Sequence, residues 1–282
     1  MKPSRRLAVW RSLRAPVTLF ALSFLLAIVL AALFAPWLFP GDPLDMQAEA
    51  LLWPGQDWHY PLGTDMLGRD VLAGLVHGAR ISLEVGALAS LCGVLLGLLV
   101  GALGGYFGGR LDYALLRLVE IFQTMPSFVL LIALVAIVQP SVPTLVFAIA
   151  LISWPTVARL VRAEVRSIRQ REYVLAARSV GYGHWRIILR EVLPNVLPTL
   201  VVTASIMIAS AILMESALSF MGLGDPNHVS WGSMIGNGRE QIRTAWYLTA
   251  IPGIAIFLTV LAFNLLGDAL TDFFTPNRAD DA

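Results

Sequence analysis

Six long apolar stretches constrain this chain more than any other feature of its sequence. A helix that crosses a lipid bilayer needs about 20 mostly apolar residues, and each stretch reaches or approaches that length. Charged residues make up only 14% of the chain, well below the share in soluble domains. The sequence therefore predicts an all-α, polytopic membrane protein with six transmembrane helices. The expected spans cover residues 17–39, 81–107, 113–138, 142–161, 196–221 and 247–267.

These spans divide the chain into a simple order of segments. The first stretch is longer than the roughly 7–15 residues of a signal-peptide core, so we expect it to remain as a helix. The long inner connection, 162–194, interrupts a core of five further helices. The expected segments are a cytoplasmic tail (1–16), the first helix (17–39), an outer segment (40–80), the five-helix core (81–267) and a second cytoplasmic tail (268–282).

The positive charges predict how the chain is oriented. With the N-terminus inside and six spans, only four of the 20 lysines and arginines lie outside, namely Arg69, Arg80, Arg239 and Arg243. Lysine and arginine concentrate on the cytoplasmic side of membrane proteins. Five spans, or the reverse orientation, would remove this asymmetry. We therefore expect both termini in the cytoplasm.

The inner connection contains two short amphipathic segments separated by Gly181 and Gly183. Apolar residues recur at helical spacing on both sides of these glycines, which break helices. Such helices can lie on lipid headgroups, pack as an ordinary hairpin, or seat in a groove of a partner protein. The periodic residues are Tyr173, Ala176, Ala177 and Val180, then Trp185, Ile188, Leu189 and Val192.

The same segment resembles a known motif. Ala176-Ala177, followed by Gly181 and then by Leu193-Pro194, resembles the cytoplasmic EAA loop of binding-protein-dependent ABC importer permeases. Leu175 stands where that family usually has Glu. The resemblance implies that this loop couples the chain to an ATP-hydrolysing subunit. The coupling residues it implies are Glu172, Tyr173, Ala176, Ala177, Gly181, Trp185, Leu193 and Pro194.

Three further segments resemble the second permease subunit of dipeptide, oligopeptide and nickel importers. They are PLGTDMLGRDVLAGLVHGARISL (61–83), ESALSFMGLG (215–224) and PGIAIFLTVLAFNLLGDAL (252–270). The resemblance implies a type I ABC importer permease fold in a bacterial inner membrane, with segment 40–80 in the periplasm. It also implies a second homologous permease, two cytoplasmic ATPase subunits, a periplasmic solute-binding protein and alternating access. The cargo would be peptides or a related solute such as a nickel chelate.

The chain lacks the residues that other functions need. A phosphate-binding P-loop requires a lysine after its glycines, and the only lysine is Lys2. We therefore expect ATP on partner subunits and no cofactor on this chain. We also expect no metal site, because no histidine has ligand spacing, and no catalysis, because Ser233 has no evident base. The net charge of +1 gives no sign of nucleic acid. An importer driven by an ion gradient is the alternative of another class.

Polar residues near the outer end of the fifth span form a second group of candidates. An acidic side chain within a span usually faces a bundle interior or an aqueous path. We expect this group to line or gate the pathway, or Glu215 to reach the outer interface instead. The candidates are Ser210, Met214, Glu215 and Ser216.

The outer segment carries a third group of candidates. Two Gly-x-Asp-like clusters read as tight turns, in which Asp65 and Asp70 could cap a following helix. They could instead contact a substrate-delivery protein. The residues are Gly63, Thr64, Asp65, Gly68, Arg69 and Asp70.

Overall fold

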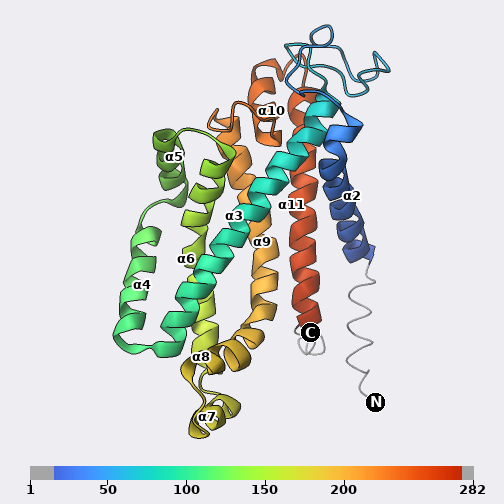
Figure 1. Cartoon of the computed structure of the whole chain (residues 1–282). Coiled ribbons are helices and arrows are strands. Elements are labelled where there is room, and N and C mark those ends of the chain that lie inside the picture. Colours follow the sequence, from blue (N-terminus) through green and yellow to red (C-terminus); the bar gives the residue numbers. More distant parts are fainter. Residues whose placement is uncertain (1–15, 275–282) are drawn as a thin grey trace.

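The computed structural model describes residues 16–274, and most of that range is helical. Long helices run between the two ends of an elongated bundle (Figure 1). No β-strand occurs within residues 16–274, so the predicted all-α class is confirmed. The elements are α2 (Pro16–Leu38), α3 (Val71–Phe107), α4 (Gly109–Thr124), α5 (Ser127–Val138), α6 (Val142–Ile168), α7 (Glu172–Ser179), α8 (His184–Ile187), the π-helix η1 (Ile188–Val192), α9 (Leu193–Phe220), α10 (Trp231–Gly238), the 3-10 helix η2 (Arg239–Gln241) and α11 (Tyr247–Phe274).

Five helical segments within the described range are long and apolar enough to cross a membrane, and the bent pair α4–α5 makes a sixth if it is counted as one span. The prediction of one continuous helix over 113–138 is wrong, because α4 and α5 are bent by 83°. The break falls at Met125, whose ψ of 139° is extended, immediately before Pro126. Proline disfavours helical geometry in the residue before it, which accounts for the position of the break.

Several boundaries also differ from the predicted ones. Helix α3 begins at Val71, well before the predicted start at Ile81, because the Asp70 side chain caps its N-terminus. The irregular outer segment therefore covers residues 39–70, which we call the outer loop. At the other end, α11 continues to Phe274, so part of the predicted C-terminal tail is helical. Residues 1–15 and 275–282 of the predicted tails lie outside the described range.

Helix α3 crosses the bundle obliquely and packs against α6, α9 and α2 (Figure 1). Glycines on its inner face let neighbouring backbones approach closely. A Cβ atom on Gly97 would lie 2.5 Å from Val157 Cβ, and one on Gly101 would lie 2.5 Å from the Ala158 carbonyl oxygen. The α3–α6 contact therefore depends on the absence of side chains at these positions.

A charged pair fixes α4 to α6 near the inner end of the bundle. Arg162 Nη2 donates to Asp112 Oδ2 at 2.7 Å, and Arg162 Nε donates to the other carboxylate oxygen. On the exposed side of α4, Arg117 and Glu120 form an ion pair at 2.8 Å, as expected for residues three apart on one helix. The Asp112–Arg162 pair is the more protected of the two, since both side chains are largely covered.

Replacing Gly97 by leucine should separate α3 from α6. Overpacking of this kind lowers the free energy of unfolding by about 1–3 kcal/mol, and more where backbone atoms are in the way. The midpoint of thermal unfolding in detergent measures the loss. Leu99→Ala on the exposed face of the same helix is the matched control, since Leu99 is 58% exposed. Equal midpoints for the two variants would contradict the tight α3–α6 contact.

Candidate functional site

The inner connection folds into two short helices separated at Gly181, as the sequence predicts. Helix α7 ends with two bonds: Gly181 N–H donates to the Arg178 carbonyl at 2.9 Å, and Tyr182 N–H to the Ala177 carbonyl at 3.1 Å. This Schellman ending needs a left-handed residue after the helix, and Gly181 has a φ of 86°. Helix α8 and the π-helix η1 then lead into α9. We call residues 172–192 the inner tip.

The inner tip packs on the bundle through a face that only partly matches the periodic residues of the sequence. Its buried side chains are Val174, Ala177, Ile187, Ile188 and Val192, which join a cluster with residues of α3, α6 and α9. Only three of these five belong to the predicted periodic set. The other periodic side chains lie on the exposed surface, with Val180 74% and Trp185 63% exposed. The exposed apolar side chains of the inner tip are Tyr173, Leu175, Val180, Tyr182, Trp185 and Leu189.

Tyr106, at the end of α3, holds the inner tip to the bundle. Its hydroxyl lies 3.2 Å from Nδ1 of His184, and the guanidinium of Arg178 stands 5.1 Å from its ring centroid. Its carbonyl accepts a hydrogen bond from Arg169 Nη1 at 2.7 Å. No local pattern could predict this role, because Tyr106 lies 78 residues from His184.

The remaining predicted coupling residues lie along the same segment. Glu172 is exposed in the first turn of α7, beside Tyr173, and Ala176 is exposed one turn later. Leu193 and Pro194 form the first turn of α9, where a proline needs no intrahelical partner. These residues share one end of the molecule, which is also the end where α2 begins and α11 finishes (Figure 1).

At the opposite end, the outer loop folds tightly around two glycines. Gly63 and Gly68 have φ values of 77° and 74°. A Cβ atom on Gly63 would lie 2.2 Å from the Leu52 carbonyl oxygen, and one on Gly68 only 2.0 Å from that of Ala48. Both glycines therefore serve close backbone contact as well as a left-handed turn.

Thr64 anchors this loop to α11. Its side chain is fully buried, and its Oγ1 donates to the Glu49 carbonyl at 2.6 Å and accepts from Leu52 N–H at 3.0 Å. The hydroxyl of Tyr247 lies 2.8 Å and 2.9 Å from the carbonyl oxygens of Leu52 and Thr64. These hydrogen bonds attach the outer loop to the first residue of α11.

Asp65 and Asp70 act as a turn residue and a helix cap, as the sequence predicts. Asp65 Oδ1 accepts from Leu67 N–H at 2.8 Å and from Arg69 N–H at 2.9 Å. Asp70 Oδ1 accepts from Leu72 N–H at 2.8 Å at the start of α3. Burial raises the pKa of the Asp70 carboxyl, although hydrogen bonds from the helix N–H groups oppose that rise.

The carboxylate of Glu215 lies fully buried where α3, α9 and α10 meet. Its oxygens accept from Ser219 Oγ at 2.7 Å, from Ser82 Oγ at 3.0 Å and from Ser216 Oγ at 3.4 Å. The Trp231 N–H, the first of α10, points to the same Ser82 oxygen at 3.4 Å. The alternative in which Glu215 reaches the outer interface is therefore wrong, because the side chain points into the bundle.

The four predicted gate residues do not form one group. Ser210 is exposed and bonds to the Ile206 carbonyl of its own helix at 3.1 Å. Met214 packs on a different apolar cluster, with α5 and α6. Only Ser216 accompanies Glu215. Ser233, which we considered as a nucleophile, forms the capping box of α10 with Ser230.

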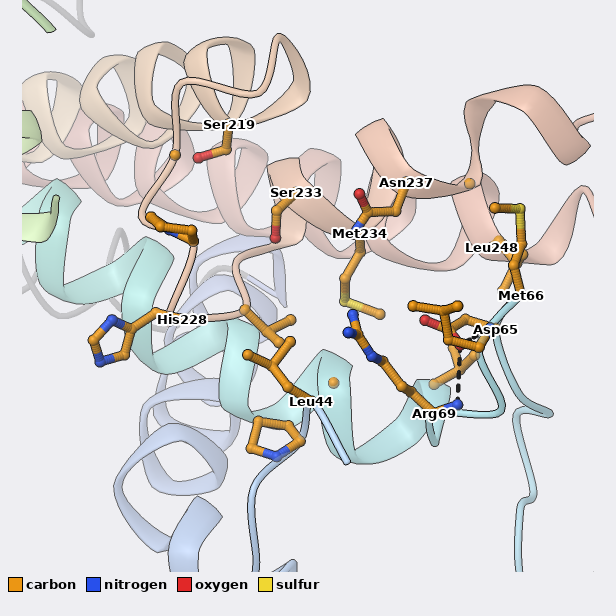
Figure 2. A pocket seen from close by; sticks show the side chains of 18 of the residues that line it. Leu44, Asp65, Met66, Arg69, Ser219, His228, Ser233, Met234, Asn237 and Leu248 are labelled. Atoms are coloured by element: carbon orange, nitrogen blue, oxygen red, sulfur yellow. Dashed lines mark hydrogen bonds between the residues drawn. The ribbon is translucent and has the colours of Figure 1, made fainter. Parts of the chain in front are cut away.

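A cavity of about 420 Å³ opens between the outer loop, the start of α3 and the segment from the end of α9 through α10 (Figure 2). We call it the outer cavity. Apolar and polar groups mix on its wall. The residues that line it include Leu44, Arg69, Val71, Asp225, Met234 and Asn237.

Asp225 joins the edge of the outer cavity to α6. Its carboxylate accepts from Val142 N–H at 3.1 Å and from Asn227 N–H at 2.9 Å, and lies 3.2 Å from His228 Nδ1. Burial alone would raise the pKa of this carboxyl, but these hydrogen bonds outweigh burial and hold the pKa below its ordinary value.

Comparison with known proteins gives a consistent picture. Residues 93–280 match the family model described as binding-protein-dependent transport system inner membrane component. The di/tripeptide transport system permease protein DppC of Pseudomonas aeruginosa is 41% identical, over 93% of this chain and 88% of its own length. The probable D,D-dipeptide transport system permease protein DdpC of Escherichia coli is 37% identical, over 95% and 90%.

A solved structure shares the fold. One chain of the MetNI methionine ABC transporter, in an inward-facing conformation, has a TM-score of 0.60 with 20% sequence identity. The match covers 72% of this chain and 96% of the other. At this identity the likeness shows the arrangement of helices.

Replacing Glu215 by alanine should loosen the junction of α3, α9 and α10. The buried serine hydroxyls would lose their acceptor, which should lower the free energy of unfolding by about 2 kcal/mol or more. Glu215→Gln keeps an acceptor oxygen and the volume, so it should cost less. Thermal unfolding of the two variants in detergent measures the difference. A Glu215→Ala variant as stable as the native protein would contradict the role of this carboxylate.

Proposed function

This chain belongs to the family of binding-protein-dependent transport system inner membrane components, and we propose that it carries short peptides inward as one permease subunit of an ATP-driven importer. The two peptide-transport permeases described above match it over more than 90% of its length. The membership favours this function over a carrier driven by an ion gradient.

We infer that the energy of ATP hydrolysis reaches this chain through the inner tip. It leaves a group of large apolar side chains exposed beyond the helical bundle, including Val180 and Trp185. Amphipathic helices commonly seat such side chains in the groove of a partner. We assign the partner as the ATPase subunit, with Glu172, Ala176 and the apolar side chains of the inner tip as the contact.

The orientation follows from the same assignment. The start of α2, the end of α11 and the inner tip share one end of the bundle (Figure 1). An ATPase works in the cytoplasm, so this end faces inward and both termini are cytoplasmic. The outer loop and α10 then face the periplasm, where the solute-binding protein delivers cargo. This orientation also agrees with the arginine distribution.

The complete importer contains more than this chain. A second homologous permease completes the pathway, two ATPase subunits bind the inner tips, and a periplasmic binding protein docks at the outer end. The transport cycle alternates access between the two sides. Helix α3 supports this mechanism, because it runs from the Asp70 cap at the outer end to Tyr106 beneath the inner tip.

Reconstitution tests the proposed function. The chain, with the second permease and ATPase subunits, is placed in liposomes, and uptake of labelled di- and tripeptides is measured with the binding protein present. We expect uptake that requires ATP and that stops when a catalytic residue of the ATPase is replaced. Peptide uptake driven by an ion gradient without ATP would contradict the proposal.

A pair of glycine variants tests the inner tip. Gly181→Val places a branched side chain at a φ of 86°, whereas Gly183→Val changes a residue at φ −64°, and a Cβ at either position meets no atom within 4 Å. The left-handed strain costs about 1–2 kcal/mol. Because such a cost shifts a conformational equilibrium about five-fold or more, peptide uptake per ATP hydrolysed should fall in the Gly181 variant.

The Gly183 variant is the matched control and should transport nearly normally. Membrane insertion of both variants should match the native chain, which immunoblots of membrane fractions check. Equal uptake by the two variants would argue against the Gly181 turn as part of the coupling contact.

A further inference from the structure

The outer cavity is shaped for a small molecule. Its volume of about 420 Å³ falls within the roughly 300–1,000 Å³ of ligand pockets. Its wall combines apolar side chains, among them Leu44, Val71 and Met234, with polar ones such as Asn237. The wall comes from segments that the hydrogen bonds of Thr64, Asp70 and Asp225 already hold in place. A ligand would therefore enter a preformed site.

The carboxylates on the wall of this cavity are already engaged. Asp65 accepts two backbone N–H groups within its own turn. Asp70 caps α3. Asp225 accepts from the first N–H of α6 and contacts His228. None of the three forms an ion pair with an arginine within residues 16–274. The acidic groups are thus held by local structure, and they leave the nearby arginine unmatched.

Arg69 is the unmatched group. Its Nε atom is buried, and no acceptor among the described residues 16–274 forms a hydrogen bond with it. Figure 2 shows the side chain extending into the cavity toward Met234. Arg69 as a whole is only half-buried, but a buried N–H without an acceptor is unfavourable, and buried polar groups are almost always paired in native structures. An anionic group from another molecule would therefore complete the site.

Hydrogen bonds fix the backbone of Arg69 at the wall of the outer cavity. Arg69 N–H donates to Asp65 Oδ1 at 2.9 Å, and its carbonyl accepts from Asp65 N–H at 3.0 Å. The neighbouring Gly68 carbonyl accepts from Gln47 and Ala48 N–H groups at 3.1 Å. A guanidinium presented from this wall can bind a planar carboxylate through two parallel hydrogen bonds.

We propose that the outer cavity binds the C-terminal end of a short peptide. Arg69 binds the terminal carboxylate, and the apolar wall around Met234 contacts the adjoining side chain of the peptide. This proposal rests on the proposed function, since it takes the cargo to be a peptide. The concave shape favours a small cargo molecule over a protruding acidic side chain of a partner protein. Arg69 would hold the peptide after the binding protein releases it and before it enters the pathway.

Photolabelling tests the site on the complete importer in nanodiscs with its binding protein. The probe is a tripeptide with a free carboxylate and a benzophenone side chain, and mass spectrometry locates the label. We expect label on residues 65–74 and 228–238. Arg69→Gln should reduce it about ten-fold or more, as for loss of a charged hydrogen-bonded pair. Arg69→Lys, which keeps the charge but loses the fork, should fall between.

Two controls sharpen the result. Arg243→Gln removes the same charge from an exposed position at the outer end, and it should label like the native protein. Unlabelled tripeptide with a free carboxylate should compete with the probe, whereas its C-terminal amide should compete about ten-fold less well. Equal competition by acid and amide would overturn the proposal.

Three other outcomes would overturn the proposal as well. Label outside these segments, or unchanged label in Arg69→Gln, would show that the cavity does not hold the peptide. If Arg69→Gln instead abolished binding of the loaded binding protein to the importer, the anionic partner would be a carboxylate of that protein. Failure of ATP-dependent peptide uptake by the native importer would count against the proposed function, and it is measured separately.

Discussion

The close approach of α3 to α6 and α9 is the contact on which both ends of the molecule depend. Gly97 and Gly101 let the α6 backbone and the side chains of Val157 and Val161 lie directly against the α3 backbone. In lipid, where apolar surface gives no drive to associate, such backbone contact supplies much of the packing energy. Since α3 carries the Asp70 cap at one end and Tyr106 at the other, this contact also fixes the outer cavity relative to the inner tip.

The polar groups inside the bundle add specificity to this packing. Glu215 brings together hydroxyl groups from α3 and α9 and, through Ser82, the first N–H of α10. A carboxylate in an apolar interior is costly unless it is well bonded, so few other arrangements of these helices could accommodate it. Gly232 reinforces the arrangement, because a Cβ there would lie 2.4 Å from the Ser216 carbonyl. Helix α10 is therefore locked to α9 at the edge of the outer cavity.

Local patterns in the sequence were enough to predict five of the spans, the turn at Gly181 and the cap at Asp70, since each depends on neighbouring residues. Contacts made at a distance could not be predicted in this way. Ser82 lies 133 residues from Glu215. The break at Pro126 was also beyond the pattern, because Pro155 and Pro252 lie inside continuous helices. Periodicity also could not say which face of the inner tip packs on the bundle, because both of its faces carry apolar residues.

The contacts of the inner tip with the bundle determine which helices would move with it. Val174, Ala177 and Ile187 are buried against the bundle, and Tyr106 holds His184, so the tip cannot slide freely over α3. Its continuation into α9 passes through the π-helix at Ile188–Val192, a rare geometry that often marks a functional adjustment in a helix. A force on the exposed side of the tip therefore reaches α9 through its least regular turn. Toward the far end of α9 lies Glu215, whose hydrogen bonds join α9 to α3 and, through Ser82, to the start of α10 beside the outer cavity.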